Sequence, residues 1–67
     1  MIRNHLREAR DAQGLTQADL AQALGVSRQT VISLEQGRYF PSLELTLRLA
    51  RHFAQPVESL FQLIEAE

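Results

Sequence analysis

Three glycines divide this chain of 67 residues into short amphipathic segments, and their spacing limits the possible folds more than any other feature. Gly14, Gly25 and Gly37 each follow a segment whose apolar residues recur at helical spacing. Glycine suits the residue after a helix because it adopts positive φ without steric cost. The pattern therefore predicts one small all-α domain built from short helices and tight turns.

The middle helices have their own start signals. Thr16 and Asp19 have the spacing of a capping box, in which each side chain accepts a hydrogen bond from the other residue's backbone. Ser27 is a good N-cap for the next helix. Only residues 24–27 (LGVS) separate these two helices, and so short a connection fits helices that cross steeply, as in a helix-turn-helix.

The remaining helices are expected on either side of this pair. The first should cover about residues 3–13. Ser42 caps a fourth helix that runs to about Phe53, and its wide apolar face makes it the central helix. That face is predicted to comprise Leu43, Thr46, Leu47, Leu49, Ala50 and Phe53. Pro56 suits the first turn of a short fifth helix, and residues 60–67 (LFQLIEAE) fit either more helix or a short extended piece.

Composition and charge exclude several functional classes. The net charge of −1 and the isoelectric point of about 6.1 argue against a generally basic, nonspecific nucleic-acid binder, so an anionic partner must meet a local patch. Cysteine is absent, and His5 and His52 lack further ligands at metal-binding spacing. No apolar run is long enough to span a membrane, and the first residues lack the apolar core of a signal peptide. We therefore expect a cytoplasmic protein with no cofactor, metal site or catalytic constellation.

Two opposite charges lie at the edges of apolar stripes. Arg10 borders the stripe of the first helix, and Glu35 borders that of the third. An ion pair is the least costly way to accommodate both, so we expect them to lock these helices together. Arg10 could also contact a phosphate, because a guanidinium has five N–H donors.

Residues 14–42 resemble the Cro and phage-repressor type of helix-turn-helix domain, also called XRE-type; they read GLTQADLAQALGVSRQTVISLEQGRYFPS. The matching motif is T-Q-x-x-L-A, then L-G-V-S, then a helix that ends in L-E-x-G. Small stand-alone dimeric regulators of the cytolysin-operon-repressor type also share SRQT and PSLEL. The flanking helices have the family's length and order, so the resemblance covers nearly the whole chain.

The resemblance implies a single domain over residues 1–67 with five helices, in which the helix-turn-helix spans residues 16–36. It also implies a short antiparallel pairing of residues 1–3 with about residues 61–64. The sequence departs from its relatives in three places: Ile32 replaces a small or polar residue, Phe40 replaces Asn or Asp, and Ala54 replaces a glycine.

The third helix fits the role of a recognition helix in the DNA major groove. Arginine binds guanine and glutamine binds adenine, each through two hydrogen bonds, while isoleucine packs against a thymine methyl group. The candidate base contacts are Arg28, Gln29, Ile32 and Ser33. The candidate phosphate contacts are Gln17, Thr30, Gln36, Arg38 and Tyr39, of which the first is placed there by the resemblance and the second fits packing equally well.

We expect this chain to be a sequence-specific, double-stranded DNA-binding transcriptional regulator and not an enzyme. The resemblance implies a homodimeric repressor that occupies a near-palindromic operator. A domain this small leaves much apolar surface unburied, which also favours self-association. The predicted dimer interface comprises Phe40, Val57, Leu60, Phe61 and Ile64. The alternative is an antitoxin or adaptor that uses the apolar residues outside the motif mainly for contacts with another protein.

Overall fold

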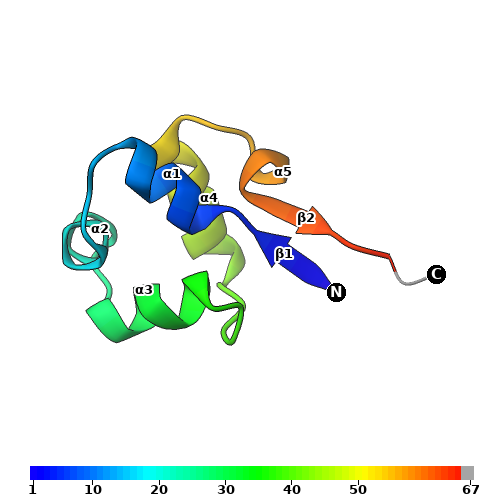
Figure 1. The fold of residues 1–67 in the computed structure, drawn as a ribbon, viewed down its shortest axis with the longest axis horizontal. Helices are drawn as coiled ribbons and strands as arrows, with labels where there is room; N and C mark the ends of the chain where they lie inside the picture. The colour runs from blue at the N-terminus through cyan, green and yellow to red at the C-terminus, as the bar shows by residue number, and fades with distance from the viewer. Residues whose placement is uncertain (66–67) are drawn as a thin grey trace.

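We describe the protein from a computed structural model, in which the described part of the chain is residues 1–65; residues 66–67 of the expected domain lie outside it. Within this part the chain forms five α-helices and a two-stranded antiparallel sheet (Figure 1). The elements in chain order are β1 (Ile2–Asn4), α1 (Leu6–Ala12), α2 (Gln17–Leu24), α3 (Arg28–Glu35), α4 (Leu43–Phe53), α5 (Val57–Leu60) and β2 (Phe61–Leu63). The predicted five-helix architecture with paired chain ends is confirmed.

The helix-turn-helix of α2 and α3 follows from local hydrogen bonds. The Thr16 hydroxyl accepts a bond from the Asp19 N–H at 3.0 Å, and the Asp19 carboxylate accepts one from the Thr16 N–H at 2.9 Å. Gly25 ends α2 with a φ of 73°, and the Ser27 hydroxyl caps α3 by accepting from the Thr30 N–H at 3.1 Å. Figure 1 shows the outcome, with α2 seen nearly end-on and α3 lying across the view.

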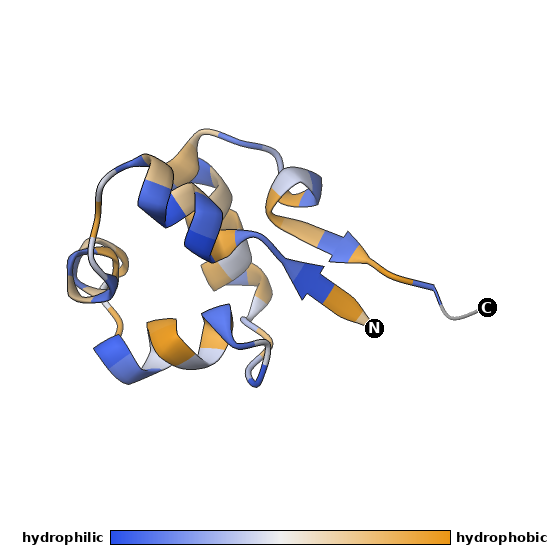
Figure 2. Ribbon diagram, viewed as in Figure 1, coloured by the Kyte–Doolittle hydropathy of each residue, from blue (hydrophilic) through white to orange (hydrophobic). Residues whose placement is uncertain are grey.

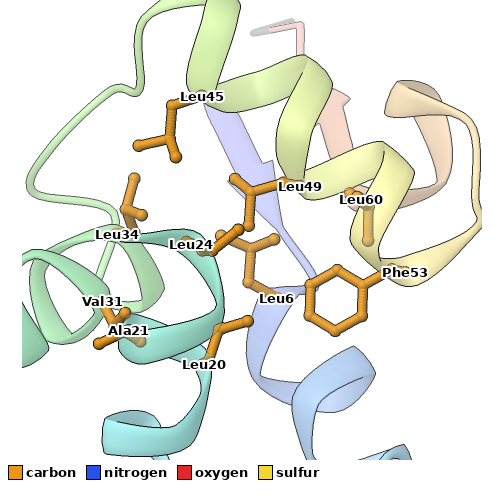
Figure 3. Close-up of a cluster of buried hydrophobic side chains, with 10 residues drawn as sticks. All are labelled: Leu6, Leu20, Ala21, Leu24, Val31, Leu34, Leu45, Leu49, Phe53 and Leu60. Atoms are coloured by element: carbon orange, nitrogen blue, oxygen red, sulfur yellow. The ribbon is translucent and has the colours of Figure 1, made fainter. Parts of the chain in front are cut away.

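The hydrophobic core collects side chains from every helix (Figure 3). Leu49 of α4 and Leu60 of α5 are completely buried. The other members are Leu6, Leu20, Ala21, Leu24, Val31, Leu34, Leu45 and Phe53. Because burying one large aliphatic side chain stabilises a fold by about 1.5–3 kcal/mol, this small cluster holds the helix-turn-helix in place against α1 and α4.

The prediction of a helix from residue 3 was wrong, because α1 begins at Leu6. The Asn4 side chain stops the helix from extending backwards: its Oδ1 accepts from the Leu6 N–H at 3.2 Å, and its Nδ2 donates to the Leu34 carbonyl at 2.8 Å. Residues before it pair with β2 instead, so their backbone groups are not available for helical bonds.

The strand pair joins the two ends of the chain. Ile2 lies opposite Leu63 and Asn4 opposite Phe61. The first strand therefore covers residues 2–4, one residue later than the residues 1–3 that the resemblance implied. The Ile64 N–H extends the ladder by donating to the Met1 carbonyl at 2.7 Å. Residues 61–64 are therefore extended, which decides between the two conformations that the sequence allowed for them.

His5 fastens this strand pair to α1. Its Nδ1 lies 3.0 Å from Glu8 Oε2, and its Nε2 lies 3.1 Å from Gln62 Oε1. These hydrogen bonds, that to Gln62 foremost, raise the pKa of His5 above its usual value of 6.5. The protonated ring suits this position because it donates from both nitrogens.

The predicted apolar face of α4 was partly wrong. The buried stripe contains Leu45, Leu49 and Phe53, spaced four residues apart, whereas Leu43 and Leu47 are 75% and 54% exposed. Residues two positions apart on a helix lie nearly on opposite sides, so a stripe through Leu45 excludes its neighbours Leu43 and Leu47 from the core. These two leucines remain on the outer surface.

The end of α4 shows backbone strain. Ala54, where the resemblance led us to expect a glycine, has a φ of 54°, in the left-handed region. An alanine there meets the steric cost that glycine avoids, on the order of 1 kcal/mol. Within residues 1–65, no helix is long and apolar enough to cross a membrane.

Candidate nucleic-acid interface

The outer side of α3 presents the four residues predicted to read bases. Arg28 and Gln29 in its first turn are exposed, and Ile32 and Ser33 are half-buried. Val31 and Leu34, on the inner side, are 1% and 2% exposed and anchor the helix in the core. Figure 2 shows the resulting pattern, with a hydrophilic start of α3 followed by an apolar middle.

A shallow hollow of about 150 Å³ brings together polar groups from α3 and the turn after it. Its lining residues are Ser27, Gln29, Thr30, Ser33 and Tyr39. The Gln29 amide nitrogen donates to the Ser33 hydroxyl at 3.4 Å, and the Ser27 and Thr30 hydroxyls lie 2.9 Å apart. The hollow is too small for a typical organic ligand, but its hydroxyl and amide groups suit hydrogen bonding to base edges or phosphates.

Arg10 and Glu35 form a nearly buried ion pair between α1 and the end of α3. Arg10 Nε donates to Glu35 Oε2 at 2.7 Å and its NH2 donates to Glu35 Oε1 at 3.3 Å, with side chains 11% and 5% exposed. Arg10 NH1 donates to the Leu15 carbonyl at 2.8 Å and lies 3.3 Å from Asp11 Oδ1. The bonds to Glu35 raise the pKa of the Arg10 guanidinium further above its usual value, so it stays charged.

Gln17 takes part in the same network, which the sequence did not indicate. Its amide Nε2 donates to Glu35 Oε1 at 3.1 Å, so this side chain packs toward the ion pair. Its backbone N–H lies in the first turn of α2, at the positive end of the helix dipole. The main-chain N–H of Gln17 is therefore a better hydrogen-bond donor for a DNA phosphate than its side-chain amide, which already donates to Glu35.

A second, polar hollow of about 350 Å³ lies over this network. It is lined by Arg7, Arg10, Gln17, Glu35 and Gln36, from α1, α2 and the end of α3. Arg7 was not among the residues predicted from the sequence. Its position three residues before Arg10, on the same side of a helix, is the signal that could have identified it.

The other predicted phosphate contacts follow α3 directly. Gln36 is the C-cap of α3, and Arg38 and Tyr39 lie in the turn that follows; all three are exposed. The Arg38 N–H donates to the Ser33 carbonyl at 3.0 Å, which holds this turn close to α3. Of the three side chains, that of Tyr39 lines the smaller hollow and that of Gln36 lines the larger one.

The residues predicted for a dimer interface differ in exposure. Phe40 is 65% exposed, and Val57, Phe61 and Ile64 are half-buried. The inclusion of Leu60 was wrong, because its side chain is completely buried in the core and has no surface to offer a partner. The helical spacing of residues 57–64 could not distinguish it from its neighbours.

The histidines make contacts within the chain. His52 Nε2 lies 3.0 Å from Gln13 Oε1, and its ring packs edge-on against Phe53 with centroids 4.8 Å apart. Among residues 1–65, no cluster of three or more His, Cys, Asp or Glu side chains is arranged to hold a metal ion.

Comparison with known proteins gives a consistent result. A family model described as a helix-turn-helix domain matches residues 2–61. An uncharacterised HTH-type transcriptional regulator from Methanothermobacter thermautotrophicus is 49% identical over 65 residues, which are 96% of this chain and 94% of that protein. Another from Methanocaldococcus jannaschii is 47% identical over 60 residues, 90% of this chain and 91% of that protein. The crystal structure of the restriction-modification controller protein C.AhdI from Aeromonas hydrophila is similar, with a TM-score of 0.72 and 37% identity, covering 81% of this chain and 82% of that one.

Proposed function

This chain belongs to the helix-turn-helix family of transcriptional regulators, and from that membership we propose that it binds a specific sequence in double-stranded DNA. The family and the named relatives identify it as a regulator rather than an enzyme. The observation that best supports sequence-specific binding is the outer side of α3, where polar side chains are presented on a helix anchored by Val31 and Leu34. A regulator of this kind acts where the chromosome lies, which we take to be the cytoplasm.

In this proposal α3 enters the major groove and reads base edges. Arg28 donates two hydrogen bonds to a guanine, and Gln29 donates to and accepts from an adenine, each with about 1–3 kcal/mol of discrimination. Ser33 lies one turn after Gln29 and accepts a hydrogen bond from its amide nitrogen, so both side chains contact the same base. Ile32 is half-buried, and its exposed part packs against a thymine methyl group.

Phosphate contacts flank the reading helix. Thr30 and Tyr39 donate hydroxyl hydrogen bonds from the smaller hollow, and Arg38 supplies positive charge. Gln17, through its main-chain N–H, and Gln36 contact DNA phosphates from the larger hollow. Since the net charge of the chain is −1, this attraction depends on a local basic surface, and binding weakens steeply as salt increases.

We further propose that the regulator is a homodimer that represses by occupying a near-palindromic operator. Two recognition helices about 34 Å apart match successive major grooves. The exposed side chains of Phe40, Leu43 and Leu47 support a self-association surface, with Val57, Phe61 and Ile64 as half-buried additions. The leucines were expected in the core, and their exposure strengthens the argument for a covered outer surface.

The experiment for DNA binding selects bound sites from random duplex DNA and then compares the selected duplex with a random one. Arg28→Ala with Gln29→Ala should remove the preference for the selected duplex while circular dichroism shows an intact fold, because both side chains are exposed. Arg51→Ala removes a charge from the last turn of α4 and should leave the preference unchanged. A double variant that still discriminates would disprove the reading role of α3.

Self-association is tested by analytical ultracentrifugation. Phe40→Glu should convert a dimer to a monomer without unfolding, because Phe40 is 65% exposed in the single chain. A wild-type chain that sediments as a monomer at high concentration contradicts the homodimer. If the chain instead copurifies with another protein at fixed stoichiometry, the same apolar surface would favour the antitoxin or adaptor function.

A further inference from the structure

The side chain of Asn4 joins the paired chain ends to the end of α3. Its Oδ1 accepts from the Leu6 N–H at 3.2 Å, and its Nδ2 donates to the Leu34 carbonyl, thirty residues away, at 2.8 Å. Leu34 lies in the last turn of α3. In Figure 1 the end of β1 lies beside the end of α3, as this bond requires. One amide therefore links two segments that are distant in sequence.

The backbone around Asn4 is held firmly, so its side chain has a fixed origin. Asn4 lies opposite Phe61 in the strand pair. The next residue, His5, donates its N–H to the Leu60 carbonyl at 2.8 Å, and the side chain of Leu60 is completely buried in the core. Because both polar atoms of the Asn4 amide are also bonded, a side chain held in this way can fix the position of the group that it binds.

The Leu34 carbonyl is shared with the turn that follows α3. The Gly37 N–H donates to the same oxygen at 3.1 Å, so this carbonyl accepts two hydrogen bonds, one for each lone pair. Gly37 has a φ of 74° and lies in the turn that leads to Arg38 and Tyr39. The bond from Asn4 therefore acts at the point where this turn leaves the helix.

Packing alone does little to fix this turn. Residues 36–40 are all exposed. A Cβ added to Gly37 would meet no heavy atom of the described residues within 4 Å, apart from its chain neighbours. Where buried contacts are few, hydrogen bonds decide how well a segment keeps its conformation. The last turn of α3 is accordingly held at two groups, its Glu35 carboxylate by Arg10 and its Leu34 carbonyl by Asn4.

In the proposed function Arg38 and Tyr39 contact DNA phosphates, and such contacts depend on where the turn holds the two side chains. We infer that Asn4 is a positioning residue for DNA binding: its bond to the Leu34 carbonyl holds the turn after α3 so that Arg38 and Tyr39 reach the DNA backbone. The paired chain ends thereby serve DNA binding as the support of this turn. This inference rests on the proposed function.

Asn4→Ser separates the two hydrogen bonds of this side chain. A serine hydroxyl accepts from the N–H two residues later, as asparagine does, but it is too short to reach the Leu34 carbonyl. That carbonyl keeps the Gly37 N–H, so circular dichroism should show an intact fold. Affinity for the selected duplex should fall about fivefold, the equivalent of one intramolecular hydrogen bond. An unchanged affinity overturns the inference.

A double-mutant cycle distinguishes positioning from a general structural role. The second change is Arg38→Gln with Tyr39→Phe, which removes both phosphate-contacting groups of the turn. In that background Asn4→Ser should change affinity by less than about twofold, because no contact is left to position. An equal fall in both backgrounds overturns the inference, since a residue that only stabilised the fold would weaken binding by the same factor in each. A turn variant that binds as tightly as the wild type overturns it as well.

Phe53→Leu is the control for stability. Figure 3 shows Phe53 on the side of the core away from Leu34, and its replacement by a smaller side chain lowers stability without touching the end of α3. Under conditions in which every variant is folded, its affinity for the selected duplex should equal that of the wild type. A fall as large as that of Asn4→Ser would attribute both to stability and overturn the inference.

The wild type separates a failure of this inference from a failure of the proposed function. A wild type that binds the selected duplex no better than the random one refutes the proposed function, and the role of Asn4 with it. The outcomes that overturn only the role of Asn4 leave sequence reading by α3 in place, because Arg28 and Gln29 lie in the first turn of that helix, at the end away from Leu34.

Discussion

Breaking the Arg10–Glu35 pair from one side should remove much of the stability of this domain. Opposite charges with side chains 11% and 5% exposed are partly desolvated, and removing one partner leaves the other buried without compensation, a loss of about 3–5 kcal/mol. At about 0.05–0.15 kcal/mol per residue, a chain of 67 residues has a total stability of only about 3–10 kcal/mol. The single variants should therefore lose a large share of this stability.

The remaining contacts indicate which of the two side chains costs more stability to replace. In Glu35→Gln, Arg10 keeps its bond to the Leu15 carbonyl and its contact with Asp11, so the loss should lie near the lower end, about 3 kcal/mol. In Arg10→Met, the Glu35 carboxylate keeps only the Gln17 amide among these partners, so the loss should lie nearer the upper end, about 5 kcal/mol.

Urea denaturation followed by circular dichroism, at one protein concentration, measures both variants and the Arg10→Met, Glu35→Gln double variant. The double variant should lose less than the sum of the single losses, with a coupling energy of at least about 2 kcal/mol, because it leaves neither charge unpaired. Losses that add to within about 0.5 kcal/mol would refute the argument that desolvation dominates this pair.

Three further variants test local features of the fold. Ala54→Gly should raise the free energy of unfolding by about 0.5–1 kcal/mol because it relieves the left-handed strain at φ 54°, and an unchanged urea midpoint would contradict this. Thr16→Ala should lower it by about 1 kcal/mol through loss of the α2 cap, while Thr16→Ser should restore most of it. His5 has a folded-state pKa raised by Gln62 and Glu8, so its contribution is fully present below about pH 6.5 and lost as pH rises through the folded-state value. The stability difference between wild type and His5→Gln should therefore shrink from about pH 6 to about pH 8; a constant difference would argue against a protonated His5.

The sequence predicted best those features whose partners lie close together in the chain. The hydrogen bonds between Thr16 and Asp19 join residues three apart, and the Ser27 cap likewise reaches only to Thr30. Spacing and residue type are then enough to locate the helix ends of the helix-turn-helix, because the groups satisfy each other locally.

The errors arose where the partners are distant in sequence. Residues 3–5 have acceptable helical character, but their backbone pairs with residues 60–62, more than fifty positions away. The exposure of Leu43 and the burial of Leu60 depend on which side of each helix meets the rest of the molecule, and leucine is compatible with both. Arg7 was missed for the same reason, since its hollow exists only when α1, α2 and α3 come together.

The pairing of the chain ends has a consequence for how this domain folds. Bringing Ile2 opposite Leu63 closes a loop of nearly the whole chain, which costs more conformational entropy than closing the short loops between helices. We therefore expect the helices to assemble first, through their local contacts, and the strand pair to form last. In native-state hydrogen exchange, the Ile64 amide that donates to Met1 should then exchange well before the amides of α4, through openings that leave α3 in place.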